Sequence, residues 1–139
     1  MSGEPTRVLL ADADPLQRGG WRLVLDAQPD LEVVAEVPDG VQALAVLRRL
    51  AVDVAVVDVR MPRLGGLQVT AAIAEDARIR LMQRSPVTRV VLVTATDLDR
   101  YAGPGRAAGA DAVLYKDAEP GELIAAIRDA ATFRRVLPS

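Results

Sequence analysis

Short aliphatic runs recur along the chain, and each of them has apolar residues at consecutive positions. They occupy residues 8–12, 31–37, 52–58, 89–94 and, more weakly, 112–115. Consecutive apolar positions are typical of strands buried on both faces, because neighbouring side chains of a strand point to opposite sides of the sheet. The pattern therefore predicts five central strands.

Segments with the helical spacing of apolar residues alternate with these runs. They cover residues 15–27, 41–50, 67–84, 97–108 and 120–133. Strict alternation of strands and helices predicts an α/β fold with helices on both faces of a parallel sheet. We expect a flavodoxin-like, doubly wound (βα)5 sheet with strand order 2-1-3-4-5. The 139 residues suit a single domain, with a core over residues 6–133 and the start of a linker or tail over residues 134–139.

Local signals refine several of the predicted helices. Asp14 and Asp39 each precede a helix at a position where a side chain can cap free backbone N–H groups. The fourth helix contains Gly103-Pro104-Gly105, and an interior proline costs about 3 kcal/mol, so we expect this helix to be short, broken or mobile. Residues 77–83 are interpreted as an extension of the third helix.

Composition excludes several kinds of site and partner. Cys and His are absent, which excludes disulfides, thiolate or imidazole metal sites and Cys/His or Ser/His catalytic pairs. A net charge of −2 without a long basic run argues against direct binding of nucleic acid by this domain. No apolar run approaches the roughly 18 residues that span a bilayer, and no targeting segment opens the chain. We expect a cytoplasmic protein without membrane contact.

Chemically useful side chains follow four of the predicted strands: Asp12, Asp58, Thr94 and Lys116. In a 2-1-3-4-5 sheet, ligands bind beyond the carboxyl ends of the strands, between strands 1 and 3. Two carboxylates at that point can hold a hard cation such as Mg²⁺. Asp58 is then a candidate nucleophile that forms an acyl phosphate, with Thr94 and Lys116, the only lysine, around the phosphoryl oxygens. The structural alternative is a surface ion pair between Lys116 and either carboxylate.

These residues carry a resemblance to the receiver domain of bacterial two-component response regulators that covers nearly the whole chain. The matching segments are Val8-Leu9-Leu10-Ala11-Asp12, Asp58-Val59-Arg60-Met61-Pro62 with Gly66-Leu67, Val91-Leu92-Val93-Thr94, Ala108-Gly109-Ala110 and Lys116-Asp117. Residues 97–101 and the Lys-Asp ending are similar to the NarL/FixJ subgroup, whose members usually carry a C-terminal LuxR-type helix-turn-helix domain. The resemblance implies a signalling module in two-component signal transduction and transcription regulation, and not an enzyme.

The resemblance also implies roles for individual residues and for partners. Asp58 would be the phosphoacceptor, Thr94 the switch hydroxyl and Lys116 the contact to the phosphoryl group. Mg²⁺ would be held by Asp12, Asp58 and the backbone carbonyl of Arg60. The implied partners are a histidine kinase and the chain's own C-terminal DNA-binding domain, and a homodimer is left open.

Four positions bear on how far the family pattern holds. The first strand of the family normally ends in two adjacent acids, but here the second position is Ala13, so we expect weak Mg²⁺ binding. Asp14 is an alternative metal ligand, although an N-cap role suits it better. Gly65 stands where the family often has an acid, and Val113 stands where an aromatic side chain usually moves on activation.

Three functional interpretations remain open at this point. The first is an atypical receiver domain whose phosphorylation is impaired or absent and which responds to contacts, dimerisation or a small molecule. The second is a conventional Mg²⁺-dependent phosphoacceptor served by a histidine kinase. The third is a flavodoxin-like small-ligand domain, which the first loop does not favour because it lacks a Ser/Thr/Gly phosphate cradle. The triplet Asp12-Ala13-Asp14 also resembles the nucleophile motif of haloacid-dehalogenase-like phosphatases, a weak match.

Overall fold

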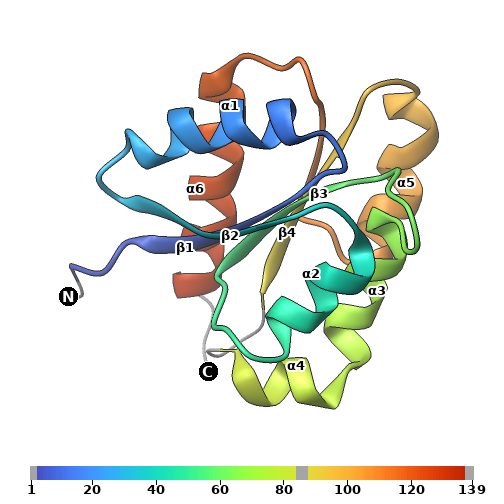
Figure 1. Ribbon diagram of the computed structural model, residues 1–139, viewed down its shortest axis with the longest axis horizontal. Helices are drawn as coiled ribbons and strands as arrows, with labels where there is room; N and C mark the ends of the chain where they lie inside the picture. Colours follow the sequence, from blue (N-terminus) through green and yellow to red (C-terminus); the bar gives the residue numbers. More distant parts are fainter. Residues whose placement is uncertain (1–2, 84–87, 137–139) are drawn as a thin grey trace.

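A twisted parallel sheet runs through the centre of the computed structural model, which describes residues 3–83 and 88–136 (Figure 1). Its strands are β1 (Thr6–Ala11), β2 (Leu31–Val37), β3 (Val54–Asp58), β4 (Arg89–Thr94) and β5 (Ala112–Tyr115). The strand order is β2-β1-β3-β4-β5, and every neighbouring pair is parallel. Both the predicted fold class and the predicted strand order are confirmed.

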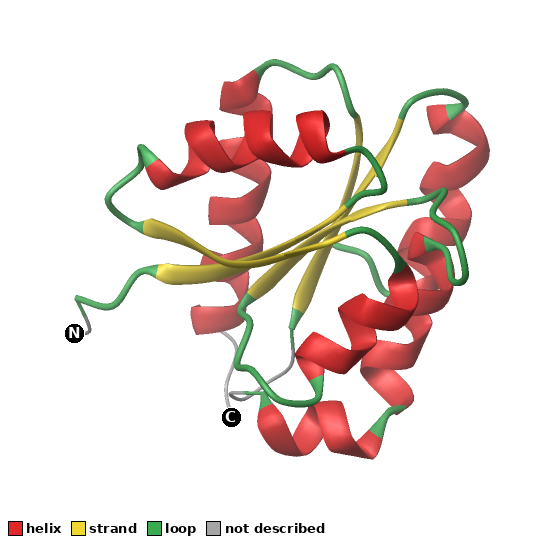
Figure 2. Ribbon diagram, viewed as in Figure 1, coloured by secondary structure: helices red, strands yellow, loops and turns green. Residues whose placement is uncertain are grey.

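Helices cover both faces of the sheet (Figure 2). They are α1 (Pro15–Asp26), α2 (Gly40–Leu47), α3 (Gly66–Glu75), α4 (Ala77–Met82), α5 (Leu98–Ala108) and α6 (Pro120–Val136). Helices α1 and α6 lie together on one face, whereas α2, α3 and α5 lie on the other (Figure 1). Helix α4 is an additional short helix beside α2 and α3.

The core has two apolar layers because successive strand residues point to opposite faces. Val8 and Leu10 of β1 pack toward α1 and α6, in the same cluster as Trp21. Leu9 and Ala11 pack on the opposite face, with residues of α2 and α3. Strands β1, β3 and β4 are buried on both faces, which explains why their sequences are aliphatic runs rather than alternating patterns.

Two predicted helix caps are confirmed. The Asp14 side chain accepts a hydrogen bond from the backbone N–H of Leu16 at 2.9 Å, at the start of α1. The Asp39 side chain accepts one from the N–H of Gln42 at 2.8 Å, at the start of α2. Each carboxylate satisfies a backbone donor that the first helical turn leaves free.

The prediction of one long helix over residues 67–84 is wrong, because Asp76 divides this segment. Its backbone is extended, and its carboxylate caps α4 by accepting hydrogen bonds from Arg78 and Ile79. The same carboxylate accepts two hydrogen bonds from the Arg48 guanidinium, at 2.9 and 2.7 Å. Residue 84 lies outside the described residues.

The expectation of a short or broken fourth helix is also wrong, because α5 continues through Gly103-Pro104-Gly105. Pro104 lies on the exposed side of the helix, where water can satisfy the carbonyl that loses its N–H partner. Gly105 is buried, and a Cβ atom there would lie 2.8 Å from Leu92 Cδ1. The glycine therefore allows α5 to approach β4 closely, and the helix ends at Gly109 with a φ of 115°.

Other element boundaries also differ from the prediction, and the larger differences are at β1, β3, α2 and α6. Strand β1 begins at Thr6 rather than at residue 8. Strand β3 begins at Val54 rather than at residue 52. Helix α2 ends at Leu47, three residues before the predicted end, and α6 continues to Val136 rather than ending at 133. The linker predicted for residues 134–139 falls partly on this helix, and residues 137–139 lie outside the described part of the chain.

Candidate functional site

The carboxyl ends of neighbouring strands bring the predicted site residues together. Asp12 directly follows β1, Asp58 is the last residue of β3, Thr94 ends β4 and Lys116 directly follows β5. These four strands are adjacent in the sheet. The order of the strands therefore brings together residues such as Asp12 and Lys116, which lie more than one hundred positions apart in the sequence.

Lys116 joins the two carboxylates. Its Nζ atom lies 2.7 Å from Asp12 Oδ2 and 2.7 Å from Asp58 Oδ2. Asp12 is fully buried, Asp58 is 5% exposed, and the Lys116 side chain is 19% exposed. The predicted ion pair is present, and it involves both aspartates at a partly closed site rather than one aspartate at an open surface.

Burial and the contacts between Lys116 and the two carboxylates have opposite effects on the pKa values of Asp58 and Lys116. Burial raises the pKa of the Asp58 carboxyl above its ordinary value, and the neighbouring Asp12 charge adds to this rise. Lys116 and the backbone N–H of Arg60 oppose the rise without cancelling it. For Lys116, burial would lower the pKa, but hydrogen bonds to Asp12 and Asp58 outweigh it and the pKa is raised.

Backbone hydrogen bonds hold the second oxygen of each carboxylate. Asp12 Oδ1 accepts from the N–H of Asp14 at 2.8 Å, and Asp58 Oδ1 accepts from the N–H of Arg60 at 3.1 Å. Each carboxylate thus presents one oxygen to its own loop and the other to Lys116. This arrangement fixes the orientation of both side chains.

The Thr94 hydroxyl is occupied within its own loop. It donates a hydrogen bond to the backbone carbonyl of Thr96 at 2.6 Å, and Thr94 is 2% exposed. The hydroxyl would have to leave this carbonyl in order to donate to a group on Asp58.

The residues around Ala13 do not supply a third carboxylate. Asp14 is exposed and directs its side chain to the N–H of Leu16. Within residues 3–83 and 88–136, no three acidic side chains come together in a way that could hold a metal ion. The two carboxylates that do meet, Asp12 and Asp58, offer the oxygen donors that a hard divalent cation prefers.

The loop between β3 and α3 passes close to Asp58 because two glycines permit it. A Cβ atom at Gly66 would lie 2.5 Å from the carbonyl oxygen of Asp58, and one at Gly65 would lie 2.7 Å from the carbonyl oxygen of Val59. A side chain at either position would push the loop away from the strand. Gly65 thus lets this loop lie close to the end of β3.

Val113 is buried in β5 and faces the α5 side of the sheet. An added Cβ at Gly105 would lie 3.1 Å from its Cγ2 atom, so the space beside this side chain is already filled by the helix. The position therefore holds a small aliphatic side chain that is part of the core.

Two contacts near the site are absent from the sequence-based predictions. The Arg18 guanidinium donates to the backbone carbonyl of Asp12 at 2.5 Å and forms an ion pair with Glu36. The Arg60 guanidinium donates to the Tyr101 hydroxyl from two nitrogens, at 3.1 and 3.2 Å. The one available signal was the position of Arg18, since a cation near a helix N-terminus is unfavourable unless another contact holds it.

Comparison with known proteins covers almost all of this architecture. Residues 8–128 match the family model described as the response regulator receiver domain. The uncharacterized transcriptional regulatory protein YxjL of Bacillus subtilis is 40% identical over 94% of this chain and 56% of its own length. The nitrate/nitrite response regulator protein NarP of Escherichia coli is 33% identical over 95% of this chain and 58% of its own length.

Solved structures lead to the same family. The signal receiver domain of the putative response regulator NarL from Mycobacterium tuberculosis has a TM-score of 0.79 and 34% identity, and the alignment covers 94% of this chain and 99% of that one. The chain spans somewhat more than half the length of the curated relatives it matches. None of the helices in the described residues has the length and hydropathy needed to cross a membrane. With Asp12, Asp58, Thr94 and Lys116 at the sheet edge as the resemblance predicted, the chain belongs to the response regulator receiver domain family, and its relatives are NarL-type regulators of two-component signalling.

Proposed function

We propose that this chain is an atypical receiver domain, in which Asp58 is the phosphoacceptor but its phosphorylation is impaired or absent. The observation that supports this proposal is that, among the described residues, no third acid joins Asp12 and Asp58, because Asp14 caps α1. Mg²⁺, when bound, would neutralise charge that develops on the transferred phosphoryl group. Asp12, Asp58 and the Arg60 carbonyl are the proposed ligands, and the missing acid at position 13 lowers their affinity for the ion.

The proposed reaction is transfer of a phosphoryl group to Asp58. An Asp58 carboxylate oxygen forms a bond to phosphorus, the bond between phosphorus and the donor's leaving group breaks, and the leaving group takes the electron pair. Lys116 is held within 2.7 Å of the attacking carboxylate and would bind a phosphoryl oxygen. Thr94 would leave the Thr96 carbonyl and donate to a second oxygen.

In the whole protein, we propose a histidine kinase as the phosphodonor partner and a C-terminal DNA-binding domain as the output. The NarL-type relatives support a further domain, because they extend well beyond the region that this chain matches. We propose a cytoplasmic signalling module that is not an enzyme, and a homodimer as one form of the regulator. The same relatives favour this function over the flavodoxin-like and phosphatase interpretations.

The test is the intact mass of the protein after incubation with acetyl phosphate and Mg²⁺, with Asp58→Asn as the control. Little or no phosphate-sized gain on a folded protein supports impaired phosphorylation. A complete gain that is lost in Asp58→Asn supports the conventional phosphoacceptor instead. A gain that persists in Asp58→Asn contradicts the assignment of Asp58.

A further inference from the structure

Arg60 contacts the proposed phosphoacceptor and helix α5 at the same time. Its backbone N–H donates to Asp58 Oδ1 at 3.1 Å, and its guanidinium donates from two nitrogens to the Tyr101 hydroxyl at 3.1 and 3.2 Å. Tyr101 lies in the first turns of α5. One residue of the loop after β3 thus joins Asp58 to this helix, and the function proposed above gives the Arg60 side chain no role.

The α5 end of this contact is well held. The Tyr101 side chain is partly buried and packs against the core cluster that contains Leu92 and Val113. The guanidinium groups of Arg60 and Arg100 lie 6.0 and 5.6 Å from the centroid of its ring, at distances where cation–π attraction acts. A displacement of Arg60 therefore acts on the helix and not only on a free side chain.

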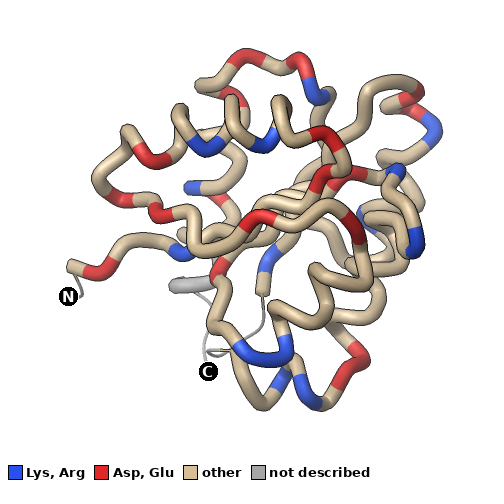
Figure 3. The backbone as a smooth tube through the Cα atoms, in the orientation of Figure 1, with Lys and Arg blue, Asp and Glu red and all other residues tan. Residues whose placement is uncertain are grey.

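The Arg60 side chain also responds to charge at the site. The hydrogen bonds to Tyr101 raise the pKa of Arg60, and the carboxylates of Asp97 and Asp58 add to this rise. Asp97 immediately precedes α5, and Figure 3 shows charged positions at the start of this helix and basic positions on the loop after β3. A change in the charge of Asp58 thus changes the force on a group that is bonded to α5.

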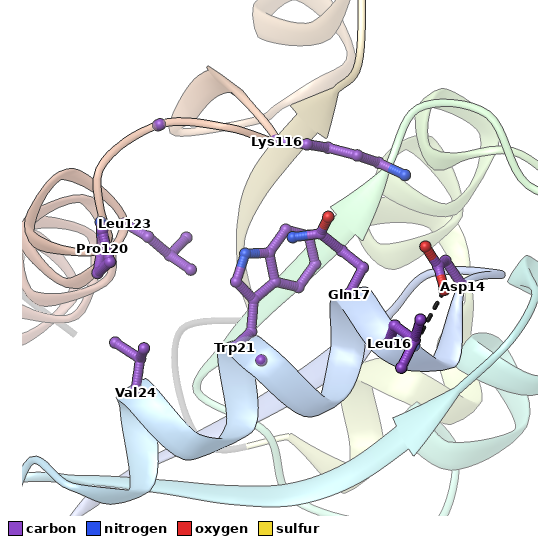
Figure 4. Close-up of a pocket in the computed structure, with 10 residues that line it drawn as sticks. Asp14, Leu16, Gln17, Trp21, Val24, Lys116, Pro120 and Leu123 are labelled. Carbon is purple, nitrogen blue, oxygen red and sulfur yellow. Dashed lines mark hydrogen bonds between the residues drawn. The ribbon is translucent and has the colours of Figure 1, made fainter.

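The second polar partner of the Asp58 carboxylate leads to the opposite face of the sheet. Within residues 3–83 and 88–136, the hydrogen-bond and ion-pair partners of this carboxylate are Arg60 and Lys116. Lys116 lines a pocket together with Gln17 and Trp21 of α1, beside the start of α6 (Figure 4). Helix α5 packs on the other face. Arg60 is therefore the partner that leads from Asp58 to α5.

Strand β5 offers no comparable link. Val113 stands where the resemblance places a mobile aromatic side chain, but it is buried, and its Cγ2 would lie 3.1 Å from a Cβ atom at Gly105. Tyr115, the only other tyrosine, is 44% exposed, and its side chain makes no polar contact with any described residue. Neither of these side chains joins Asp58 to α5.

The loop after β4 is the competing connection. The Thr94 hydroxyl donates to the carbonyl of Thr96 at 2.6 Å, and the Thr96 hydroxyl donates to Asp97 Oδ2 at 3.4 Å. These bonds reach the start of α5, but neither of them involves Asp58. The Arg60 contact, in comparison, is bonded at both ends.

We propose that the contact between Arg60 and Tyr101 couples the state of Asp58 to the stability of the first turns of α5. In this chain it takes the place of a mobile aromatic side chain on β5. Loss of the Asp58 carboxylate frees the Arg60 N–H, the loop after β3 shifts, and α5 loosens where Tyr101 is attached. The inference does not depend on phosphorylation, because any change at the carboxylate acts through the same contact.

The test measures whether a change at Asp58 reaches α5. Asp58→Ala removes the acceptor of the Arg60 N–H, and hydrogen exchange reports the opening of individual amides. We expect the amides of residues 100–103 in α5 to exchange at least threefold faster in this variant, relative to those of residues 123–127 in α6, on the other face. No change in α5, or an equal change in both helices, would overturn the proposal.

The two tyrosines provide a matched pair of variants, because phenylalanine at either position removes one hydroxyl group. In a Tyr101→Phe chain, Asp58→Ala should cause no further rise in α5 exchange. In a Tyr115→Phe chain, it should cause the same rise as in the native chain. A rise that persists in Tyr101→Phe would overturn the proposal, and its loss in Thr94→Val would then assign the coupling to the loop after β4.

Coupling between two sites is reciprocal, so loss of the Tyr101 hydroxyl should also loosen the contact at Asp58. We expect Tyr101→Phe to speed exchange of the Arg60 N–H at least twofold and Tyr115→Phe to leave it unchanged. Urea denaturation of both variants verifies that each is folded. Equal exchange of the Arg60 N–H in the two variants would contradict the proposal.

Discussion

Lys116 Nζ and Asp58 Oδ2 lie 2.7 Å apart at the ends of β5 and β3, two strands separated in the sheet by β4. The ammonium group crosses the end of β4 to reach the carboxylate and also contacts Asp12. One cation thus faces two buried anions and leaves one negative charge uncompensated. The charge balance of this group leads to predictions about stability as well as about phosphorylation.

Asp58→Asn should stabilise the protein at pH 7 by on the order of 1 kcal/mol. Because burial raises the pKa of Asp58 above 3.8, the folded state binds more protons than the unfolded state between 3.8 and the raised value. The stability of the native chain therefore falls as pH rises through that interval. Urea denaturation at several pH values checks this: the advantage of the variant should disappear below pH 3.8, and a variant less stable at pH 7 would contradict it.

Lys116→Met should destabilise the protein by roughly 3 kcal/mol, because it leaves Asp12 and Asp58 buried without their cation. Adding Asp58→Asn to this variant should restore part of the loss, since it removes the repulsion between the two carboxylates. A double-mutant cycle by urea denaturation measures the coupling. Additive effects of the two substitutions would show that the contact has no energetic consequence.

Gly103→Ala and Gly105→Ala should have opposite effects, although both lie in α5. A Cβ at position 103 meets no atom within 4 Å, so alanine should stabilise the helix by about 1 kcal/mol. At position 105 it would lie 2.8 Å from Leu92 Cδ1, so alanine should destabilise by about 1–3 kcal/mol. Thermal unfolding of the two variants measures the difference, and a shift in the same direction for both would contradict the close packing of α5 on β4.

Ala13→Asp should tighten Mg²⁺ binding at least tenfold. A carboxylate about 4 Å from a unit positive charge gains roughly 4 kcal/mol at an effective dielectric of 20, and loss of hydration offsets part of that gain. Ala13→Asn is the control, because it has nearly the same size without the charge. Isothermal titration calorimetry compares the three proteins, and equal affinities in the aspartate variant and the native chain would refute the proposal that Ala13 weakens Mg²⁺ binding.

The sequence was sufficient to predict the sheet and the convergence of Asp12, Asp58, Thr94 and Lys116 at its carboxyl edge, because each of them lies at a strand end. Asp12 and Asp58 follow unbroken aliphatic runs, and the order of the strands then determines which ends are adjacent. The features that the sequence did not predict depend on contacts between residues far apart in the sequence. The sequence around Asp76 is compatible with a continuous helix. The contact between its carboxylate and Arg48, 28 residues earlier, is not visible in the local sequence.

The same reason explains the error at α5. The intrinsic cost of Gly103-Pro104-Gly105 argues for a break, but that cost takes no account of packing. Gly105 lies against Leu92 and Val113, so a close contact with the sheet keeps the helix in place. The contact between Arg60 and Tyr101 joins residues 41 positions apart and has no local sequence signal.

We infer that the alanine at position 13 impairs phosphorylation of Asp58, and the most direct test compares phosphorylation with and without an acid at this position. The measurement is the time course of intact mass with acetyl phosphate and Mg²⁺ for the native chain, Ala13→Asp and Ala13→Asn. Each of the three is measured again with Asp58→Asn added, as a control. We predict little or no phosphate-sized gain for the native chain and Ala13→Asn, and a clear gain for Ala13→Asp that Asp58→Asn abolishes. A native chain phosphorylated as fast and as completely as Ala13→Asp would contradict the claim.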